Sequence, residues 1–428
     1  MKPLKIALLC IVIVISCKQK ITAQDKINIT IEEAEKQFLE TNLQLLAERC
    51  NISIADAAII QAKVLNNPTI GMSGINFWNP NAAREVEVTP NSFGNRIVFS
   101  VELEQLIRTA GKRRKFVDME KVSKDIAVQE FEAFLLNLKT ELKTILHETV
   151  YLQSYLNIIK KQQETIDNLV QVYKSQTLHG NIAKSELIRL QSSLIELETE
   201  ANETRTEVNK QYKEIKSLLN INPSTEIVIT AEISVSVKNP DELSLTDLLE
   251  MAKISRPELL LSDLNVKYHE KLLVYEKAQR SPDISLSVNY DRYGGVWKNF
   301  VGIGISLDIP VFNRNQGNIK MAKLNLEQSN YNADYQKNAI QQEVAECYNN
   351  YKMNYLFYKK LMDNDFSEDL DSMLEVYSRN FLQKNINMLE YIDFMYAYKT
   401  TKQAILTAKK NLETSFAELQ CSVNNEIK

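Results

Sequence analysis

Side chains able to bind metals or carry out catalysis are few in this chain and lie far apart. The three histidines are His147, His179 and His269, and no two stand at the spacing of a ligand pair. The five cysteines contain no Cys-x-x-Cys pattern, so neither a zinc site nor a disulfide framework is predicted. No nucleophile paired with a base, phosphate-binding loop or dinucleotide motif occurs. We therefore expect a protein that is not an enzyme and that holds no cofactor or metal.

Methionines in the last quarter of the chain could suit a soft metal ion such as copper or silver. Their spacings of 9, 11, 15 and 7 residues do not place the sulfur atoms on one helical face. We therefore expect them to fill gaps in a core. These residues are Met353, Met362, Met373, Met388 and Met395.

Acidic and amide side chains recur in two stretches that lie 204 residues apart, at 167–187 and 371–391. Six identities relate the stretches, and each stretch contains a candidate helix break, at Gly180 in the first and at Asn385 in the second. We interpret the two breaks as equivalent tips of a duplicated structure. The matching pairs are Asp167 and Asp371, Val172 and Val376, Tyr173 and Tyr377, Asn181 and Asn385, Ile182 and Ile386, and Glu186 and Glu390.

Very long helices must carry these tips. Only 10 glycines and 9 prolines occur in 428 residues, and residues 112–179, 181–222 and 318–428 contain neither. From Leu135 to Tyr173 the apolar spacing alternates between three and four residues, which is typical of a coiled coil. The formal net charge of −4 offers no basic surface for nucleic acid.

Two predicted β-hairpins interrupt the helices, at residues 69–77 with 96–104 and at 283–293 with 300–309. In the second hairpin apolar side chains alternate with small or polar ones. This alternation is typical of strands with lipid on one side and water on the other, and Trp78 and Trp297 would suit a membrane interface. Four strands cannot close a water-filled barrel, so this interpretation requires several copies. A soluble sheet lying on a helix is the alternative.

The order of elements is repeated. We expect a first repeat at 25–220, a connector at 221–244 and a second repeat at 245–424, each with a helix, a hairpin and two long helices. The first helix is predicted at 31–65, with Thr30 and Glu33 as a capping box. The last helix is predicted to start at Asn318 and to turn back at Asn385.

A targeting segment begins the chain. A basic start and an apolar run from Ile6 to Ser16 predict a signal segment at 1–23, so the chain leaves the cytoplasm. Cleavage after Ala23 is one interpretation. The other is cleavage after residue 16 and acylation of Cys17, since Val14-Ile15-Ser16-Cys17 resembles a bacterial lipobox.

Taken together, the chain resembles the TolC family of outer-membrane channel proteins over essentially all of its mature length. The resemblance rests on Pro68 and Pro282 between helix and strand, on Ile31-Glu32-Glu33-Ala34, on the segment from Ile309 to Ile319, and on Glu390-Tyr391-Ile392-Asp393. It implies a homotrimer in outer-membrane lipid, with a twelve-stranded barrel built from four strands per protomer and an α-barrel of coiled coils extending into the periplasm.

The function implied by the resemblance is that of an exit duct in a tripartite efflux system, docked to a periplasmic adaptor and an inner-membrane pump of the RND type. Residues 310–317 are most similar to the heavy-metal cation efflux branch, so metal cations or small toxic compounds are the expected cargo. A multidrug or protein-secretion duct of the same fold is one alternative, and a structural periplasmic coiled-coil adaptor is another.

The resemblance also implies roles for single residues. Glu390 and Asp393, with Glu186 from the first tip, would form an acidic ring that gates the entrance and attracts cations. Phe381 and Ile386 occupy positions of an ionic lock found in some relatives, so that lock is not expected here. The adaptor would dock on Leu178, Gly180, Asn181, Lys384, Asn385 and Ile386.

Overall fold

The computed structural model describes residues 26–76, 98–230, 237–294, 297–363, 366–425 and 427. The predicted signal segment, Cys17 and Trp78 lie outside the described residues, and for Trp297 only the backbone is described. The chain divides into two compact units, each built from both predicted repeats. The first contains residues 1–46, 135–252 and 343–428, and the second contains residues 47–134 and 253–342.

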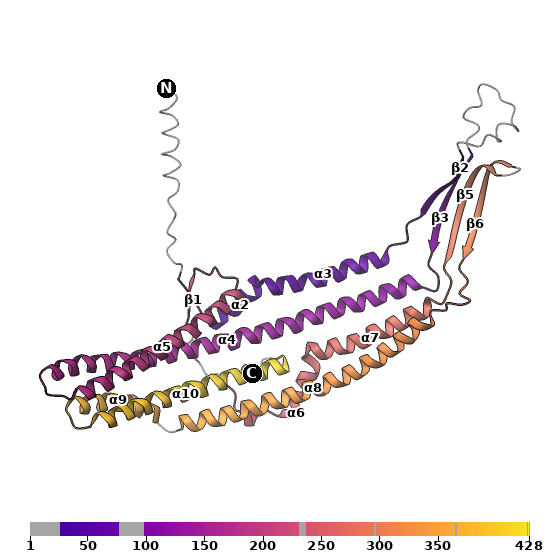
Figure 1. Ribbon diagram of the computed structural model, residues 1–428. Helices are drawn as coiled ribbons and strands as arrows, with labels where there is room; N and C mark the ends of the chain where they lie inside the picture. Colours follow the sequence, from indigo (N-terminus) through magenta and orange to yellow (C-terminus); the bar gives the residue numbers. More distant parts are fainter. Residues whose placement is uncertain are drawn as a thin grey trace, which may run out of the picture. The chain divides into compact units, whose positions relative to one another are not determined.

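Helices dominate both units (Figure 1). The helices are α2 (Ile31–Thr41), α3 (Leu43–Lys63), α4 (Lys112–Leu178), α5 (Lys184–Leu218), α6 (Leu245–Ser255), α7 (Pro257–Ala278), α8 (Gln316–Met362), α9 (Phe366–Leu382) and α10 (Met388–Val423), with the 3-10 turn η3 (Pro240–Glu242). The strands are β1 (Lys26–Ile29), β2 (Thr69–Asn76), β3 (Val98–Ile107), β4 (Glu226–Ile229), β5 (Ile284–Gly294) and β6 (Trp297–Leu307).

The predicted first helix is two helices, because Asn42 interrupts it. The capping box of Thr30 and Glu33 starts α2 as predicted. The backbone is extended at Asn42, and its side chain both accepts and donates a hydrogen bond. Its Oδ1 accepts a hydrogen bond from the Leu45 N–H at 2.8 Å, and its Nδ2 donates to the Leu218 carbonyl at 2.9 Å. A buried asparagine therefore caps α3 and ties it to the end of α5.

The last predicted helix also differs, since it begins at Gln316 and is divided after Met362. The Asp363 N–H makes the last α-helical hydrogen bond there, to the Lys359 carbonyl at 2.8 Å. Asp363 follows the end of α8, and aspartate favours turns and caps over helix interiors.

Four strands of the second unit form one antiparallel sheet in the order β2-β3-β5-β6 (Figure 1). The pairing of β3 with β5 joins the two predicted hairpins. Along one face, register pairs put apolar residues in continuous rows across all four strands, such as Ile70, Leu103, Val288 and Ile303. These side chains are exposed, Ile303 by 83%.

The opposite face of this sheet is polar and closely packed between β5 and β6. Gly302 lies opposite Asn289, and Gly304 lies opposite Ser287. A Cβ atom added at Gly304 would come within 2.5 Å of the Ser287 Oγ, so glycine is required for this approach. The predicted two-faced hairpins are therefore present, although β3 extends to Ile107 and β6 ends at Leu307.

In the first unit, α4 packs against more than one helix. The predicted seam is partly correct, since Leu142, Ile159 and Tyr173 are buried but Ile145 is only half-buried. Leu146 and Leu169, which lie beside the seam, are also buried. The extra buried positions widen the apolar face, so α4 can contact α5 on one side and α9 and α10 on the other.

A small parallel sheet completes this unit. β1 pairs with β4 from Lys26 with Glu226 to Ile29 with Ile229. This sheet was not predicted, because each strand has only four residues and the two are paired across about 200 residues of sequence.

Candidate functional site: the two helical tips

The first predicted tip is a glycine turn between α4 and α5. Gly180 has a φ of +76°, in the left-handed region that glycine adopts without strain. The Gly180 N–H donates to the Thr177 carbonyl at 3.1 Å, and the Asn181 N–H donates to the Gln176 carbonyl at 3.0 Å. These two bonds form a Schellman motif, which satisfies the last carbonyl groups of α4.

The second tip, between α9 and α10, has the same backbone. The Lys384 N–H donates to the Phe381 carbonyl at 3.0 Å, and the Asn385 N–H donates to the Asn380 carbonyl at 2.9 Å. The donors and acceptors stand 204 residues after their counterparts, so the sequence match between the two stretches reflects equivalent turns. Lys384 adopts a φ of +63° where the first tip has Gly180, so this lysine holds a left-handed conformation that is unfavourable for it.

The helices that leave the two tips start differently. In α5 the N-cap is Ala183, and no side chain caps the helix. In α10 the N-cap is Asn387, whose Oδ1 accepts from the Glu390 N–H at 2.9 Å, while the Glu390 carboxylate accepts from the Asn387 N–H at 3.2 Å. Glu390 therefore completes a capping box, a structural role that was not predicted for it.

The acidic residues predicted for the gate all lie near the starts of the helices that follow the tips. Glu390 and Asp393 lie on α10, and both are exposed. Glu186 lies on α5 and is half-buried. Burial, together with the negative charge of Glu186, raises the pKa of Tyr173 to about 12. Both tips thus present carboxylates beside their turns.

The residues predicted for adaptor docking are mostly solvent-exposed. Leu178 is 83% exposed, and Gly180, Asn181, Lys384 and Asn385 are exposed as well. Ile386 is the exception, because it is half-buried and packs against the core beneath the tips.

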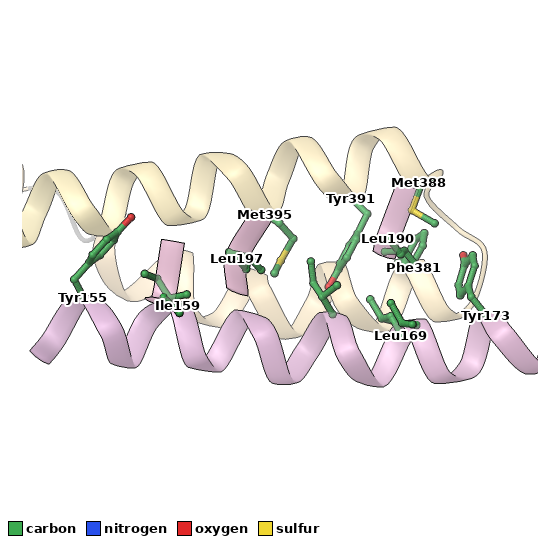
Figure 2. Packing of buried hydrophobic residues seen from close by; sticks show 13 residues of the cluster. Tyr155, Ile159, Leu169, Tyr173, Leu190, Leu197, Phe381, Met388, Tyr391 and Met395 are labelled. Carbon is green, nitrogen blue, oxygen red and sulfur yellow. The ribbon is translucent and has the colours of Figure 1, made fainter. Parts of the chain in front are cut away.

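Stacked aromatic rings hold the two tips together, and they were not predicted from the sequence. Phe381 of α9 lies between Tyr173 of α4, with ring centroids 5.4 Å apart, and Tyr391 of α10, at 4.4 Å. Each pair contributes about 1 kcal/mol beyond its buried area. Figure 2 shows Tyr391 and Met395 of α10 pointing into the buried cluster, toward the helix α4 that carries Ile159 and Leu169. The tyrosine repeated at 173 and 377 did not indicate this stack, because Tyr377 stacks on Phe394 instead.

Polar contacts reinforce the same packing further from the tips. The Lys399 ammonium lies 2.6 Å from the Glu200 carboxylate, which also accepts a hydrogen bond from the Tyr155 hydroxyl. The buried Gln162 amide donates to the Met395 carbonyl at 3.1 Å. α4, α5 and α10 are therefore cross-linked by groups from three separate parts of the chain.

Among the described residues, no helix combines the length and the hydrophobicity needed to cross a bilayer.

Several solved channel structures share the fold of this chain. CusC, whose structures concern transmembrane channel formation, matches with a TM-score of 0.73 and 15% identity over 94% of this chain and 93% of its own. The CmeC outer-membrane channel of Campylobacter jejuni gives 0.74 and 16% over 92% and 85%. The MtrE outer-membrane channel of Neisseria gonorrhoeae, in its open state, gives 0.69 and 13% over 93% and 89%.

At these identities the likeness establishes the fold. These structures are TolC-family outer-membrane channels, so the fold predicted from the sequence resemblance is confirmed. They do not distinguish the heavy-metal branch from the others. No protein-family model and no curated protein matches the sequence.

Proposed function

We propose that this chain belongs to the TolC family and that three copies form the outer-membrane exit duct of a tripartite efflux system. The observation that carries the proposal is the two-faced sheet of β2, β3, β5 and β6. Its apolar face is exposed along every strand, and its other face carries glycine, serine, asparagine and glutamate. A lipid environment removes the free-energy penalty of the exposed apolar face, while the polar face suits a water-filled lumen.

Closure of the barrel requires further copies of the chain. The strands at the two edges of the sheet are β2 and β6, and each leaves backbone groups on one side without a strand partner in this sheet. Such edges are costly in lipid, where no water can satisfy them. Three copies with four strands each form a twelve-stranded barrel, which is wide enough for a lumen.

The tips, which follow the ends of α4 and α9, are the proposed entrance. Three copies of Glu390, Asp393 and Glu186 around a constriction would attract cations and repel anions. The exposed tip residues Leu178, Gly180, Asn181, Lys384 and Asn385 would receive the helices of a periplasmic adaptor, which connects the duct to an inner-membrane pump of the RND type.

The proposed cargo is metal cations or small toxic compounds. The similarity of residues 310–317 to the heavy-metal branch supports metal cations, and the acidic tips are consistent with them. A multidrug or protein-secretion duct would use the same fold. In a strain lacking this chain, selective hypersensitivity to copper, silver or zinc salts would support metal export, whereas hypersensitivity to dyes and detergents alone would support a multidrug duct.

Delivery to the outer membrane begins with the signal segment, and acylation of Cys17 would add a lipid anchor to the inner leaflet. In cells fed a labelled fatty acid, the wild-type chain should carry the label and a Cys17→Ala variant should not. An unlabelled wild-type chain that begins at Gln24 would establish cleavage after Ala23 instead.

Fractionation distinguishes the duct from the rival function, a periplasmic coiled-coil adaptor. A duct should be extracted from outer membranes by detergent and should migrate in SDS without heating as a trimer. Release of a monomer by osmotic shock would contradict the duct and favour the adaptor.

A further inference from the structure

Four short connectors join the helices of the second unit to one end of its sheet (Figure 1). They link α3 to β2, β3 to α4, α7 to β5 and β6 to α8. The first connector lies against β3, since the Gln105 side chain donates to the Asn66 carbonyl at 2.9 Å. Together with the adjoining ends of the helices, the connectors form a surface that is called the basic collar below. It consists of residues 63–68, 108–115, 277–283 and 308–316.

Hydrogen bonds also tie the other connectors to their neighbours, so the collar is a continuous surface. The Thr109 N–H donates to the Asp283 carboxylate at 2.8 Å, which connects the second connector to the third. The Asn315 side chain donates to the Glu276 carbonyl at 2.9 Å, which connects the fourth connector to the end of α7. The charged groups of all four connectors therefore lie at one level of the second unit.

The collar is strongly basic, although the whole chain has a net charge of −4. It contains nine lysines and arginines and two aspartates, and the aspartate at 283 is already bonded to Lys112. All five arginines of the collar are exposed, and none forms an ion pair with a carboxylate of the described residues. So much unpaired positive charge attracts an anionic partner from outside the chain. The five are Arg108, Arg113, Arg114, Arg280 and Arg314.

Exposed apolar side chains lie beside these cations. Val311 and Phe312, in the connector between β6 and α8, are exposed by 56% and 93%. The collar also borders the apolar face of the sheet, whose last row is Ile107, Ile284 and Leu307. Apolar and basic side chains in one band are typical of a protein surface at the boundary between lipid and water.

In the proposed duct, this band lies at the surface of the outer membrane. The apolar face of the sheet lies in lipid and all four helices leave the sheet at the collar, so the collar meets the periplasmic leaflet. Anionic phospholipids carry phosphate groups there, and a guanidinium group binds two phosphate oxygens through paired N–H donors. A basic cluster directly beside a membrane-spanning segment attracts such lipids.

We propose that the basic collar binds the phosphate groups of anionic phospholipids in the periplasmic leaflet. The arginines hold the phosphates, while Val311 and Phe312 lie against the glycerol and the first carbons of the acyl chains. This inference rests on the proposed duct and deepens it, since it assigns the class of lipid that surrounds the helical end of the barrel. Three copies would place the arginines in a ring around the duct.

Lipid retention by the purified full-length trimer tests the collar. The trimer is equilibrated in neutral detergent with equal amounts of anionic phosphatidylglycerol and zwitterionic phosphatidylethanolamine, and the retained lipids are counted by native mass spectrometry. The wild type should retain phosphatidylglycerol in preference by about fivefold or more, which is the effect of one cation near an anionic surface. The preference should disappear in about 1 M sodium chloride, where the screening length is only about 3 Å.

The test variant combines Arg113→Gln, Arg114→Gln and Arg280→Gln, and it should retain the two lipids almost equally. The control removes the same charge from exposed positions of α5 in the first unit and should keep the wild-type preference. The control substitutions are Arg189→Gln, Arg205→Gln and Lys213→Gln.

Several results would overturn the inference and leave the duct standing. They are equal retention of the two lipids by the wild-type trimer, a preference that persists in high salt, and an unchanged preference in the test variant. The salt result decides even if the test variant does not assemble. Loss of the preference in excess inorganic phosphate, but not in sodium chloride of equal ionic strength, would assign the collar to free phosphate instead. A water-soluble monomer that needs no detergent would contradict the duct on which the inference rests.

Discussion

Lys384 occupies the turn position that Gly180 occupies in the first tip, and the two residues differ in the conformational free energy of this position. It holds a left-handed conformation that costs a non-glycine residue about 1 kcal/mol, whereas Gly180 holds the equivalent conformation without that cost. The Lys384→Gly variant should therefore be more stable by about 0.5–1 kcal/mol, and Gly180→Ala should be less stable by about 1 kcal/mol. Urea unfolding in detergent measures both, and a change of the same sign for the two substitutions would contradict the equivalence of the turns.

At the acidic ring, charge and helix capping can be separated. Glutamine can replace Glu390 in the capping box, because its side chain oxygen still accepts from the Asn387 N–H. Glu390→Gln combined with Asp393→Asn should therefore lower cation selectivity in bilayer recordings without changing stability. Glu390→Ala should in addition lose about 1 kcal/mol of stability. Unchanged selectivity in the amide double variant would remove the gate assignment.

The aromatic stack at the tips gives a further prediction at this scale. Phe381→Leu keeps an apolar side chain but loses two stacked ring contacts, so we expect a loss of about 2 kcal/mol. Leu382→Ala, at the neighbouring exposed position, is the control and should change stability by less than about 0.5 kcal/mol. Thermal unfolding of the two variants compares them directly, and equal losses would show that the stack does not hold the tips.

Between elements of the second unit, an ion pair at the base of the sheet adds to the pairing of β3 with β5. The Lys112 ammonium, whose side chain is only 5% exposed, lies 2.8 Å from the Asp283 carboxylate. Burial alone would raise the pKa of Asp283, but hydrogen bonds from Lys112 and from the Thr109 N–H outweigh it and hold this pKa below its usual value of 3.8. The pair joins the start of α4 to the start of β5, and hence the two repeats.

Removal of this pair should depend on pH. Because the pKa of Asp283 is lower in the folded state, its ionised form stabilises the protein above about pH 4, and this contribution is lost as the pH falls through the folded pKa. Asp283→Asn leaves the buried Lys112 ammonium without its carboxylate, although the Ser281 carbonyl still accepts from it, so the variant should cost about 3 kcal/mol near neutral pH. The difference from wild type should shrink below about pH 4.

The control is Asp263→Asn, which breaks an exposed pair with Lys337 and should cost less than about 0.5 kcal/mol at any pH. Urea unfolding of both variants across this pH range makes the comparison. A loss for Asp283→Asn that stays constant down to about pH 3 would contradict the role assigned to the ionised carboxylate.

Elements were predictable where one local pattern determined them. The absence of glycine and proline from 112–179 predicted α4, and the alternation of side chains predicted β5 and β6. The interruption at Asn42 could not be predicted, because it depends on a hydrogen bond to Leu218, which is 176 residues away in the chain. The broad buried face of α4 was underestimated for the same reason, since a helix with several neighbours buries more than a single seam.

For the molecule as a whole, the duplication and the sheet are what connect the sequence to the fold of a channel. The equivalent turns at Gly180 and Lys384 and the pairing of β3 with β5 bring the repeats together as the resemblance implied. The roles of Glu186, Glu390 and Asp393 remain predictions, because a ring of carboxylates forms only when several copies assemble.

The central claim is that the assembled chain is a duct, and conductance through planar lipid bilayers tests it most directly. Purified wild-type trimer should insert from one side and give uniform steps of current, with a reversal potential in a salt gradient that shows preference for cations. The contradicting result is a trimer that inserts into bilayers, as shown by its protection from protease, but passes no current over the full voltage range. It would have to remain silent even when Glu390, Asp393 and Glu186 are replaced by alanine.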